Sequence, residues 1–395
     1  MTKNGLKHSI SSMPIYRRLL KPSMKSSFFL FGPRGTGKTS WLKENYKNAA
    51  YIDLLEDEIF NQLMANPGKL LNYIPENIKN EFVIIDEIQK VPKLLDEVHR
   101  LIELKKLKFI LTGSNARKLK RAGVNLLAGR ALTYEMYPLT ATELNKDFDL
   151  KKALKYGTLP LSITGDEPKK FLQSYVRTYL KEEIQGEGLT RNLEAFARFL
   201  QTASFSQGAP LVISNIASEA GINRKVVEDY FSILRDLLLS VELPIFAKRS
   251  KRELITKRKF YYFDAGVYRS LRPVGPLDSD AEINGFALET LVLNEIRVLN
   301  DQMEMGYELF YWHTKDHLEV DFVIYGAKGF RAFEVKSAAT IHSKDLQGLR
   351  EFKKDYPQAK LYLLYGGSTE KLMESTIHLV PVTQFFKNPT FYLLD

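Results

Sequence analysis

Short apolar runs alternate with amphipathic stretches along the first third of the chain. The first run, at residues 28–31, leads into a glycine-rich segment and then into a helical pattern that continues to Lys47. Further apolar runs lie at residues 50–54, 82–85, 108–111 and 131–137. Runs of this length between helical stretches are typical of buried parallel strands. The pattern therefore predicts an α/β unit, preceded by a basic, polar leader with a short helix at residues 15–20.

The pattern becomes mainly helical in the middle of the chain. Residues 150–185 hold two helical patterns around a Gly-Thr-Leu-Pro turn, and residues 192–204 predict another helix. A helix near residues 213–217, a turn at Gly221 and a long amphipathic run at residues 224–239 together form a helix-turn-helix signature. A strand at residues 241–247 and the basic cluster after it are then expected to form the wing of a winged helix. That cluster is Lys248, Arg249, Lys251 and Arg252.

Strands and helices mix again in the last third. A strand is predicted at residues 259–263, and a long helix at residues 281–300. Strands at 318–325 and 330–336 are joined by a four-residue loop, and residues 359–365 and 377–382 supply two more. This part is expected to be a second α/β unit.

The glycine-rich segment after the first apolar run fits the pattern G-x-x-x-x-G-K-[ST]. In such a loop the glycines let the backbone turn tightly and point N–H groups at a polyphosphate, while the following helix adds a favourable dipole. Lys38 is expected to reach the β- and γ-phosphates, and the Thr39 hydroxyl is expected to bind Mg²⁺. The residues expected to hold the nucleotide are Gly32, Pro33, Arg34, Gly35, Thr36, Gly37, Lys38, Thr39 and Ser40.

Two carboxylates directly follow the apolar run at residues 82–85. A buried parallel strand would deliver Asp86 beside the phosphate loop, where it holds Mg²⁺ through water, and Glu87 would polarise the attacking water. The alternative, that Asp86 only caps the next helix, does not explain why it occurs together with the loop motif. The two motifs predict a nucleotide-hydrolysing site.

Two further residues are candidates for this site. The strand at residues 108–111 ends in Thr-Gly-Ser-Asn, and either Ser114 or Asn115 can orient the hydrolytic water near the γ-phosphate. Arg130 precedes the next strand and can neutralise transition-state charge, in its own chain or across a subunit boundary. A purely structural role for Arg130 is an equal alternative.

Residues 28–145 resemble the ATPase domain of predicted AAA-type ATPases of prokaryotes. The matching stretches are GPRGTGKT (32–39), VIIDEIQKVP (83–92), ILTGSNAR (110–117) and LAGRALTYEMYPLTATEL (127–144). The resemblance implies a P-loop NTPase domain of the ASCE/AAA type, with an open parallel sheet, the nucleotide at the strand carboxyl ends and helices 150–185 as a lid. No Asn-Lys-x-Asp guanine-reading motif is visible, so ATP is expected rather than GTP. Such enzymes usually act as oligomers, which implies a homo-oligomer.

The net positive charge of the chain is compatible with a DNA partner. Lys and Arg number 57 against 47 Asp and Glu, a net charge of +10, which is compatible with a polyanionic partner. The predicted winged helix, its basic cluster and the nearby Lys257, Arg258 and Lys259 predict contacts to a DNA backbone. The alternative is a packing module with a solvated charge run.

Acidic residues of the last third suggest a second site. Glu289 and Glu295 both lie on the apolar side of the helix at 281–300, and periodicity does not choose between them. If Tyr325 pairs with Phe330, Asp321 faces Glu334 across the hairpin, and Lys336 shares the face of Glu334. Two opposed carboxylates repel each other, so a cation is expected between them.

A helix glutamate, a strand aspartate and Glu-x-Lys resemble the restriction-endonuclease-like fold. The resemblance implies that Glu289, Asp321 and Glu334 bind Mg²⁺ or Mn²⁺ for phosphodiester cleavage and that Lys336 helps orient or deprotonate the water. Gln347 is a candidate accessory group. Val320 stands where the fold's motif has proline. The alternative is an inactive nuclease-like fold whose cluster is an internal ion-pair network.

The predicted organisation has five parts. They are a leader (1–27), the ATPase core (28–147), a helical lid (148–190), a winged helix (191–256) and a restriction-endonuclease-like domain (257–395). The chain has no cysteine, which excludes disulfides and thiolate chemistry. The sequence has neither an apolar run of membrane-spanning length nor an apolar signal core, so a cytoplasmic protein is expected. The predicted function is ATP hydrolysis coupled to DNA binding and cleavage; the alternative is a regulatory ATPase switch that cuts nothing.

Overall fold

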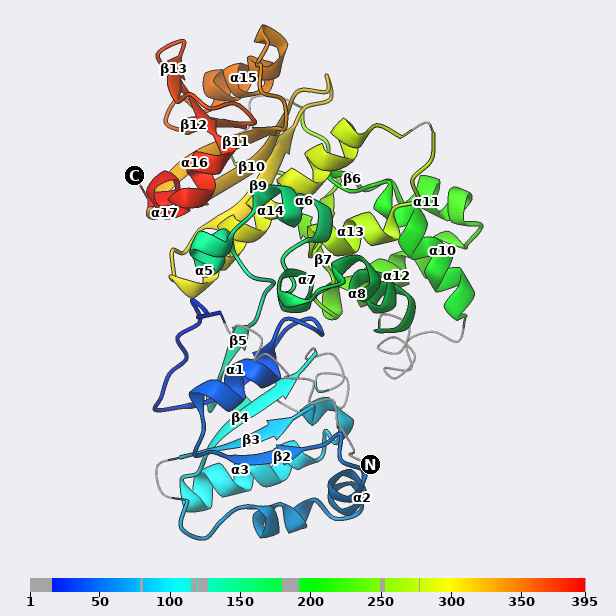
Figure 1. Cartoon of the computed structure of the whole chain (residues 1–395), viewed down its shortest axis with the longest axis vertical. Coiled ribbons are helices and arrows are strands. Elements are labelled where there is room, and N and C mark those ends of the chain that lie inside the picture. The colour runs from blue at the N-terminus through cyan, green and yellow to red at the C-terminus, as the bar shows by residue number, and fades with distance from the viewer. Residues whose placement is uncertain are drawn as a thin grey trace, which may run out of the picture.

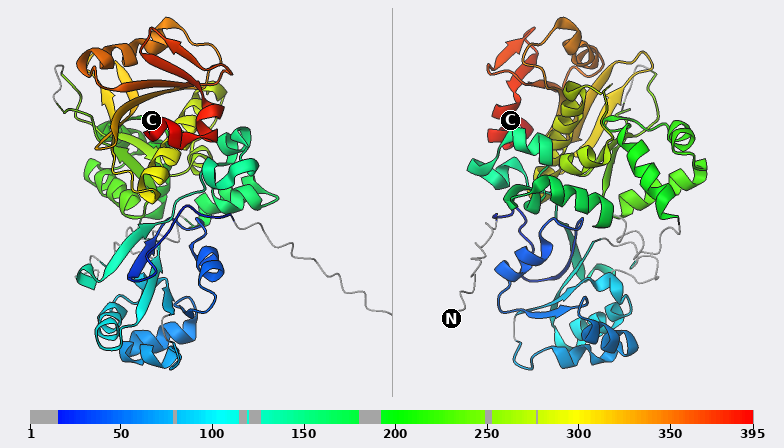
Figure 2. Two further views of the ribbon diagram at one scale, coloured as in Figure 1. Left: turned by 90° about the vertical axis from the view of Figure 1, so that its left-hand side faces the viewer. Right: turned by 45° about the vertical axis from the view of Figure 1, so that its right-hand side comes forward.

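A computed structural model describes residues 16–394 except 79–80, 115–118, 120–126, 180–191, 249–252 and 277. The molecule is elongated, as Figure 1 and the turned views in Figure 2 show. An N-terminal unit of residues 27–137, in blue and cyan, occupies one end, and the rest of the chain occupies the other. Among the described residues, no helix combines the length and the apolar character needed to cross a membrane.

The N-terminal unit is built on a five-stranded sheet with the order β2-β3-β4-β1-β5, in which all strands are parallel. The strands are β1 (Ser27–Phe31), β2 (Ala50–Asp53), β3 (Phe82–Asp86), β4 (Lys108–Gly113) and β5 (Ala131–Glu135). Strand β4 lies between β1, which feeds the phosphate loop, and β3, which carries Asp86. This interposed strand agrees with the expected ATPase core.

Helices cover both faces of this sheet. They are α1 (Lys38–Asn45), α2 (Asp57–Ala65) and α3 (Leu94–Lys105), with 3₁₀ turns η1 (Pro67–Tyr73), η2 (Ile88–Lys90) and η3 (Leu127–Gly129). Because side chains alternate along a strand, Phe29 and Phe31 of β1 enter one buried cluster while Phe28 and Leu30 enter another. The sheet is thus buried on both faces, as its continuous apolar runs predict.

The leader differs from its prediction. Residues 16–20 are irregular rather than helical. Their backbone follows the surface of the N-terminal unit, where Arg18 bonds to main-chain carbonyls and Leu20 is buried. These long-range contacts replace the local bonds of a helix in this part of the leader.

A helical segment follows the N-terminal unit and lies beside it in Figure 1. Its elements are α5 (Ala141–Leu144), η4 (Asn145–Asp147), α6 (Leu150–Tyr156), α7 (Pro160–Thr164), α8 (Pro168–Ser174) and the π-helical turn η5 (Tyr175–Tyr179). The part from residue 148 onward corresponds to the predicted lid, whereas α5 and η4 fall in the predicted ATPase core. The end of the predicted lid, residues 180–190, lies outside the described residues.

The predicted helix-turn-helix consists of α10 (Leu193–Ser204), α11 (Ile213–Ala220) and α12 (Arg224–Asp236). Asn223 caps α12, accepting a hydrogen bond from the backbone of Lys225. A small sheet β6-β8-β7 follows, formed by β6 (Ala209–Pro210), β7 (Ser240–Leu243) and β8 (Lys259–Tyr262).

The strand expected for the wing is shorter than predicted, and residues 244–248 do not continue it in this small sheet. Strand β7 ends at Leu243, and the chain then crosses to the C-terminal sheet, where Ile245 bridges Tyr311 and Phe246 is buried. Phe246 packs against Phe352 and Tyr356 of the C-terminal unit. The segment after β7 therefore docks on the last third of the chain because its aromatic side chain is buried there. Three of the four predicted wing cations, Arg249, Lys251 and Arg252, lie outside the described residues.

The C-terminal unit contains a six-stranded sheet with the order β13-β14-β12-β11-β10-β9. Its strands are β9 (Glu308–His313), β10 (Glu319–Gly326), β11 (Gly329–Lys336), β12 (Lys360–Tyr365), β13 (Lys371–Met373) and β14 (Ile377–Pro381). The helices are α13 (Ala265–Leu271), α14 (Asp280–Gln302), α15 (Gln347–Asp355), α16 (Val382–Lys387) and α17 (Pro389–Leu394), with the turn η6 (Ser343–Leu346). The sequence reading missed β9, β13, α16 and α17.

The register of the central hairpin is confirmed. Tyr325 pairs with Phe330, and the ladder continues to Phe322 opposite Phe333. The connecting turn is shorter than predicted, because Gly326 and Gly329 still pair. On the other side of β10 the pairing with β9 shifts between Val320 and Val323, and this irregularity contains Asp321. Such irregularities re-aim side chains.

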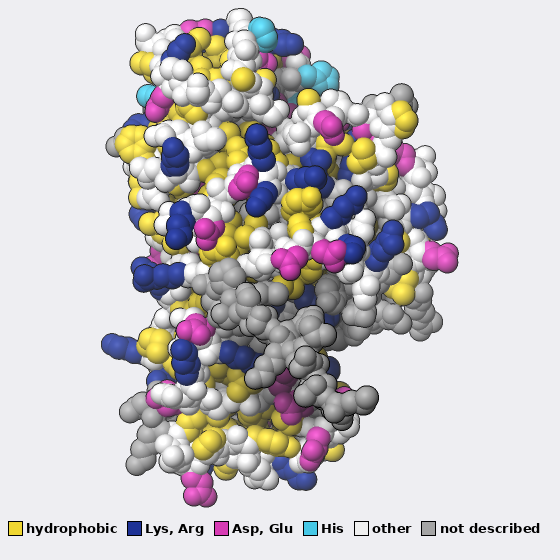
Figure 3. Space-filling model, in the orientation of Figure 1, with side chains coloured by type: hydrophobic (Ala, Val, Ile, Leu, Met, Phe, Trp, Pro, Cys, Tyr) yellow, Lys and Arg dark blue, Asp and Glu magenta, His cyan; other side chains and the backbone are white. Residues whose placement is uncertain are grey.

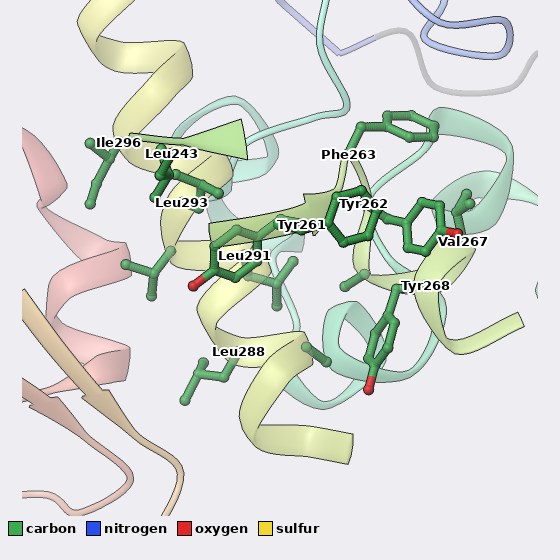
Figure 4. Close-up of a cluster of buried hydrophobic side chains, with 14 of the residues drawn as sticks. Leu243, Tyr261, Tyr262, Phe263, Val267, Tyr268, Leu288, Leu291, Leu293 and Ile296 are labelled. Carbon is green, nitrogen blue, oxygen red and sulfur yellow. The ribbon is translucent and has the colours of Figure 1, made fainter. Parts of the chain in front are cut away.

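One hydrophobic core joins the middle of the chain to the C-terminal unit. Figure 4 shows Tyr261 and Tyr262 of β8 beside Leu288 and Leu291 of α14. The same buried cluster extends from Ala141 to Leu393. Strand β7 pairs with β8, and both belong to this packed body with α14, although the predicted domain boundary between residues 256 and 257 separates β7 from β8.

Candidate nucleotide site and acidic cluster

The glycine-rich segment turns the chain from β1 into α1 at positions that only glycine satisfies. Gly37 has a φ of 93°, in the region that other L-residues rarely adopt. Gly32 is needed for a different reason: a Cβ atom there would lie 2.3 Å from the carbonyl oxygen of Met136. Both are fixed glycines of the phosphate-loop pattern, so the backbone geometry agrees with that motif.

Lys38 lies over the loop. Its Nζ atom donates hydrogen bonds to the carbonyl oxygens of Gly32 at 2.7 Å and Pro33 at 3.2 Å. The Thr36 hydroxyl donates to the Pro33 carbonyl at 2.8 Å and closes the turn. The ammonium group is thus already held above the loop, where a phosphate would replace these carbonyl oxygens as its hydrogen-bond acceptor.

A cavity of about 370 Å³ borders the loop. Its wall includes Lys38 and Thr39, together with Tyr16 from the leader and Pro160 and Leu161 from the helical segment. This volume lies in the range of small-molecule sites, and its apolar wall parts lie away from the loop sequence. The cavity wall therefore contains polar groups for phosphates and apolar side chains for a base.

Asp86 lies at the carboxyl end of β3 beside Thr39. Its Oδ2 atom accepts a hydrogen bond from the Thr39 hydroxyl at 2.9 Å. The hydroxyls of Tyr51 and Thr112 also donate to this carboxylate. Sequence analysis did not identify Tyr51 and Thr112, which lie on β2 and β4, the two strands beside β3. A hydroxyl and a carboxylate oxygen in contact fit a Mg²⁺ ion, which takes oxygen ligands.

Glu87 has an unusual backbone. Its φ of 60° and ψ of 43° place it in the left-handed region, which is uncommon for a residue other than glycine and is concentrated at functional sites. The Gln89 amide donates to its carboxylate, and Gln89 Nε2 also lies 3.5 Å from the Ser114 hydroxyl. Gln89 was missed, because a helix-turn glutamine carries no motif signal. Asn115, the alternative to Ser114, lies outside the described residues.

Arg130 lies outside the cavity of its own chain. Its side chain is exposed and pairs with Glu103 of α3, and this pairing lowers the pKa of the Glu103 carboxyl. Arg130 is absent from the described wall of the cavity. Its predicted role in stabilising the transition state, in its own chain or across a subunit boundary, stays a prediction.

Arg18 binds the loop from the leader side. Its guanidinium donates to the carbonyl oxygens of Thr36 at 2.9 Å and Tyr137 at 2.5 Å, and to Glu143 Oε1 at 3.0 Å. The pair with Glu143 is almost completely buried. The Glu143 carboxylate also accepts from the backbone of Leu19 and, as part of a capping box, of Thr140. Sequence reasoning had no signal for Arg18.

A second cavity, of about 360 Å³, lies in the C-terminal unit. All four predicted nuclease residues line it, and so does the accessory candidate Gln347. They are Glu289 on α14, Asp321 on β10, and Glu334 and Lys336 on β11. The structure therefore brings together residues that are far apart in sequence, as the predicted arrangement requires.

Lys259 occupies the centre of this group. Its Nζ atom lies 2.6 Å from Glu319 Oε1, 2.7 Å from Asp321 Oδ1 and 3.4 Å from Glu289 Oε2. The sequence reading counted Lys259 among surface cations for DNA, and that assignment was wrong: the side chain is 1% exposed. Packing of β8 against α14 draws it inward. Glu319 was missed as well.

The ionisation of these groups follows from burial and from each other. Burial, and then the charge of Asp321, raise the pKa of Glu289 to about 7 and that of Glu334 to about 8. Burial opposes ionisation of Asp321 too, but Lys259 and Lys336 outweigh it and lower the pKa of this carboxyl. Glu334 Oε2 is buried without a hydrogen-bond partner among the described residues.

The cluster does not fit a metal ion as it is arranged. Within the described ranges, no group of three or more histidines and carboxylates is disposed to hold one. The carboxylates of Glu289, Glu319 and Asp321 instead surround the Lys259 ammonium. The predicted metal roles of Glu289, Asp321 and Glu334 stay predictions without structural support.

Glu295, the other candidate on α14, has a different role. Its carboxylate accepts hydrogen bonds from the backbone of Ala141 at 2.7 Å and of Thr142 at 3.3 Å, and from the Thr142 hydroxyl at 2.7 Å. Burial raises its pKa to about 7. It therefore joins α14 to the start of α5, and the tertiary structure separates it from Glu289.

The outward face of α12 has balanced charge. Its exposed cations, Arg224, Lys225 and Arg235, are matched by Glu228, Asp229 and Asp236. Arg224 pairs with Glu228 on the helix itself. On the face shown in Figure 3, Lys and Arg side chains are spread along the molecule with acidic side chains among them. These observations give no support to a DNA contact through α12.

The comparisons with known proteins agree with the N-terminal site. Residues 25–145 match a family model described as an AAA domain. These residues form an AAA-type P-loop ATPase domain. Two families described as domains of unknown function, DUF8612 and DUF4143, match residues 147–278 and 284–385. The ATPase domain thus accounts for the strand–loop–helix and for Asp86 and Glu87.

Relatives align over most of the chain beyond the ATPase domain. An uncharacterized protein of Mycobacterium tuberculosis is 23% identical over 365 residues, covering 90% of this chain and 80% of the relative. An uncharacterized protein of Haemophilus influenzae is 23% identical over 355 residues, covering 85% of this chain and 84% of the relative. Among solved structures, the Aeropyrum pernix Orc1 protein in complex with DNA covers 64% of this chain and 86% of its own, with 15% identity and a TM-score of 0.29. A likeness this weak carries no argument about function.

Proposed function

We propose that this chain is an ATP-hydrolysing regulatory switch. The observation that carries the proposal is the contact of Thr39 and Asp86 at the loop cavity, with the left-handed Glu87 next along the chain. Bound Mg²⁺ would neutralise phosphate charge. In this assignment Lys38 binds the β- and γ-phosphates, Thr39 and Asp86 hold the ion, and Glu87 orients water for attack on the γ-phosphate.

The helical segment supplies the switching part. Pro160 and Leu161 line the cavity, and the Tyr175 hydroxyl donates a hydrogen bond to the Arg34 carbonyl at 2.9 Å. A nucleotide in the cavity therefore touches both the loop and this segment. Hydrolysis removes the γ-phosphate contacts and would loosen that connection.

Lys38→Ala and Glu87→Gln test the ATPase assignment. Lys38→Ala is expected to abolish nucleotide binding, because the loop loses the ammonium group assigned to the β- and γ-phosphates. Glu87→Gln is expected to bind ATP and to turn it over at least 100-fold more slowly, in the range known for general-base loss. Calorimetry with ATP and Mg²⁺, and phosphate release, measure the two effects.

The control uses a lysine near the site that has no assigned step. Lys47→Ala should retain binding and turnover within a few-fold, since Lys47 is exposed, pairs with Glu44 and is not part of the described cavity wall. Wild-type turnover in Lys38→Ala, or fast turnover in Glu87→Gln, would refute these roles.

A Mg²⁺- or Mn²⁺-dependent nuclease is the second candidate function. It is favoured by the convergence of Glu289, Asp321, Glu334 and Lys336 on one cavity and by the order helix α14, three antiparallel strands, helix α15 and parallel strand β12. Metal-dependent cleavage of plasmid or single-stranded DNA that disappears in Asp321→Ala and Lys336→Ala would support it. DNA binding and homo-oligomer formation stay predictions of the sequence.

A further inference from the structure

We infer that the ammonium group of Lys259 is the resident cation of the acidic cluster formed by Glu289, Glu319, Asp321 and Glu334, in place of a divalent metal ion. The inference deepens the proposed switch function and rests on it in one respect only: it explains why the C-terminal unit of a switch retains nuclease-like acids without cutting. It concerns metal binding, so it can fail while the ATPase assignment holds.

The geometry around Lys259 suits an ammonium group. An ammonium has three N–H donors, and charge-assisted hydrogen bonds to carboxylates are about 2.7–2.9 Å long. Three carboxylates, from Glu289 on α14 and from Glu319 and Asp321 on β10, lie at 2.6–3.4 Å from this one nitrogen as ion pairs, and Asp321 Oδ1 also accepts a hydrogen bond from it. The nitrogen fills the position between the carboxylates that opposite charge favours most.

Both carboxylate oxygens of Asp321 and one of Glu289 are already engaged, whereas Glu334 Oε2 has no hydrogen-bond partner among the described residues. Asp321 Oδ1 contacts Lys259, and its Oδ2 accepts a hydrogen bond from the Val335 backbone at 2.8 Å. Glu289 Oε2 accepts from the Tyr261 hydroxyl at 2.7 Å. A divalent ion would have to displace the Lys259 ammonium before it reached Asp321 Oδ1.

The backbone of Lys259 is held in place by strand pairing. It lies on β8, which pairs with β7 on one side and β6 on the other. Its neighbour Tyr261 on the same strand face also contacts Glu289, and both residues are buried. The Lys259 side chain can therefore leave the carboxylates only by turning into the cavity that it lines.

Lys336, the lysine of the nuclease-like pattern, contrasts with Lys259. Its Nζ atom contacts Glu334 Oε1 at 2.6 Å, and its side chain is 37% exposed. It therefore lies at the solvent side of the cavity and leaves the central position to Lys259. A lysine from outside the motif thus supplies the charge at the centre of the cluster.

Manganese binding to the nucleotide-free protein tests the inference directly. Electron paramagnetic resonance of Mn²⁺ titrations would be compared for wild type, Asp321→Asn and Asp86→Asn. We expect Asp321→Asn to bind as much Mn²⁺ as the wild type, because the acidic cluster holds none. Any weak binding by the wild type belongs to the ATPase site, so it should disappear in Asp86→Asn. About one Mn²⁺ per wild-type chain that is lost in Asp321→Asn would overturn the inference.

Lys259→Met supplies the positive test, because it keeps the apolar stem and removes the charge. We expect its melting temperature to fall by roughly 5–10 °C, because a buried ion pair is broken. We also expect it to gain about one Mn²⁺ per chain, with part of the melting temperature restored by Mn²⁺. Adding Asp321→Asn should remove the gained site. A folded Lys259→Met protein that binds no Mn²⁺ would overturn the inference.

A matched control and a second measurement keep this test decisive. Lys248→Met removes an exposed lysine paired with Glu308, and it should change neither Mn²⁺ binding nor the melting temperature appreciably. If Lys259→Met does not fold, the Lys259→Met/Asp321→Asn protein should be more stable than that single variant. If the single and the double variant were equally unstable, or if the two substitutions lowered stability additively, the result would contradict the ion network.

Discussion

At the scale of single residues, Arg18 connects the leader to the phosphate loop. It reaches the Thr36 carbonyl within the loop and the buried Glu143 beyond it. An arginine fork can satisfy several acceptors at once, which a lysine cannot do with the same geometry. Arg18 is therefore a positioning residue for the loop, and it acts without touching the phosphates in the assigned mechanism.

Arg18→Ala should weaken both folding and nucleotide binding. Removing one partner of a buried ion pair costs about 3–5 kcal/mol, because the Glu143 carboxylate is left uncompensated. The affinity for ATP should fall about tenfold as the loop loses its support. Arg18→Lys should restore only part of the stability. Urea denaturation and calorimetry measure the two quantities.

Arg17→Ala is the matched control, because Arg17 is adjacent and exposed. It should leave stability within about 0.5 kcal/mol of wild type. If Arg18→Ala and Arg17→Ala gave the same stability and the same ATP affinity, Arg18 would have no positioning role.

At the scale of elements, helix α14 carries two buried glutamates with different partners. Glu289 turns toward Lys259 and Tyr261, whereas Glu295 accepts hydrogen bonds from the start of α5. The two residues are six positions apart, which places them about 120° apart around the helix axis, so they point to different sides. Helix α14 thus joins the acidic cluster to the helical segment beside the ATPase site.

Glu295 should make stability depend on pH. Its pKa is raised to about 7 in the folded protein, from an ordinary value of 4.5. Between these values the folded state holds a proton that the unfolded state has released, so the stabilising contribution is complete below about pH 4.5 and is lost as pH rises through 7. The full change corresponds to about 3 kcal/mol.

Glu295→Gln removes this titration and tests it. The unfolding free energy of the wild type minus that of Glu295→Gln should decrease from pH 5 to pH 8. Urea denaturation at each pH gives the difference, and other titrating groups cancel because both proteins share them. A difference independent of pH would show that Glu295 ionises normally in the fold.

At the scale of the whole molecule, the nucleotide cavity joins distant parts of the chain. Its wall contains the loop, the leader and the helical segment, and that segment shares a core with the C-terminal unit. Binding energy in the cavity can therefore bias the position of the larger body. This is the physical basis for a switch in the proposed function.

A non-hydrolysable ATP analogue should slow hydrogen exchange beyond the loop. Protection is expected at residues 160–175, because Pro160 and Leu161 line the cavity and Tyr175 bonds to the loop backbone. Mass spectrometry of exchange with and without the analogue and Mg²⁺ measures it, and Lys38→Ala should show no change. Protection confined to residues 32–40 would argue against a switch through this segment.

Local sequence was sufficient for part of this structure. The strand–loop–helix at residues 28–45, the placement of Asp86 at a strand end, and the Tyr325–Phe330 register were all predictable. Each depends on residues within a few positions of one another, through apolar periodicity, glycine turns or a short hairpin. Such local preferences act before the chain has packed.

Only the tertiary structure decided which charged side chains meet. Arg18 and Glu143 are 125 positions apart, and Lys259 and Asp321 are 62 apart. Sequence analysis placed Lys259 on the surface, and periodicity did not choose between Glu289 and Glu295; only the resemblance to the restriction-endonuclease-like fold favoured Glu289. No local pattern distinguishes a lysine that points to solvent from one that neutralises buried carboxylates, because that depends on how β8 packs against α14. Packing of distant elements therefore fixed the chemistry of the acidic cluster, while short-range spacing fixed the phosphate loop.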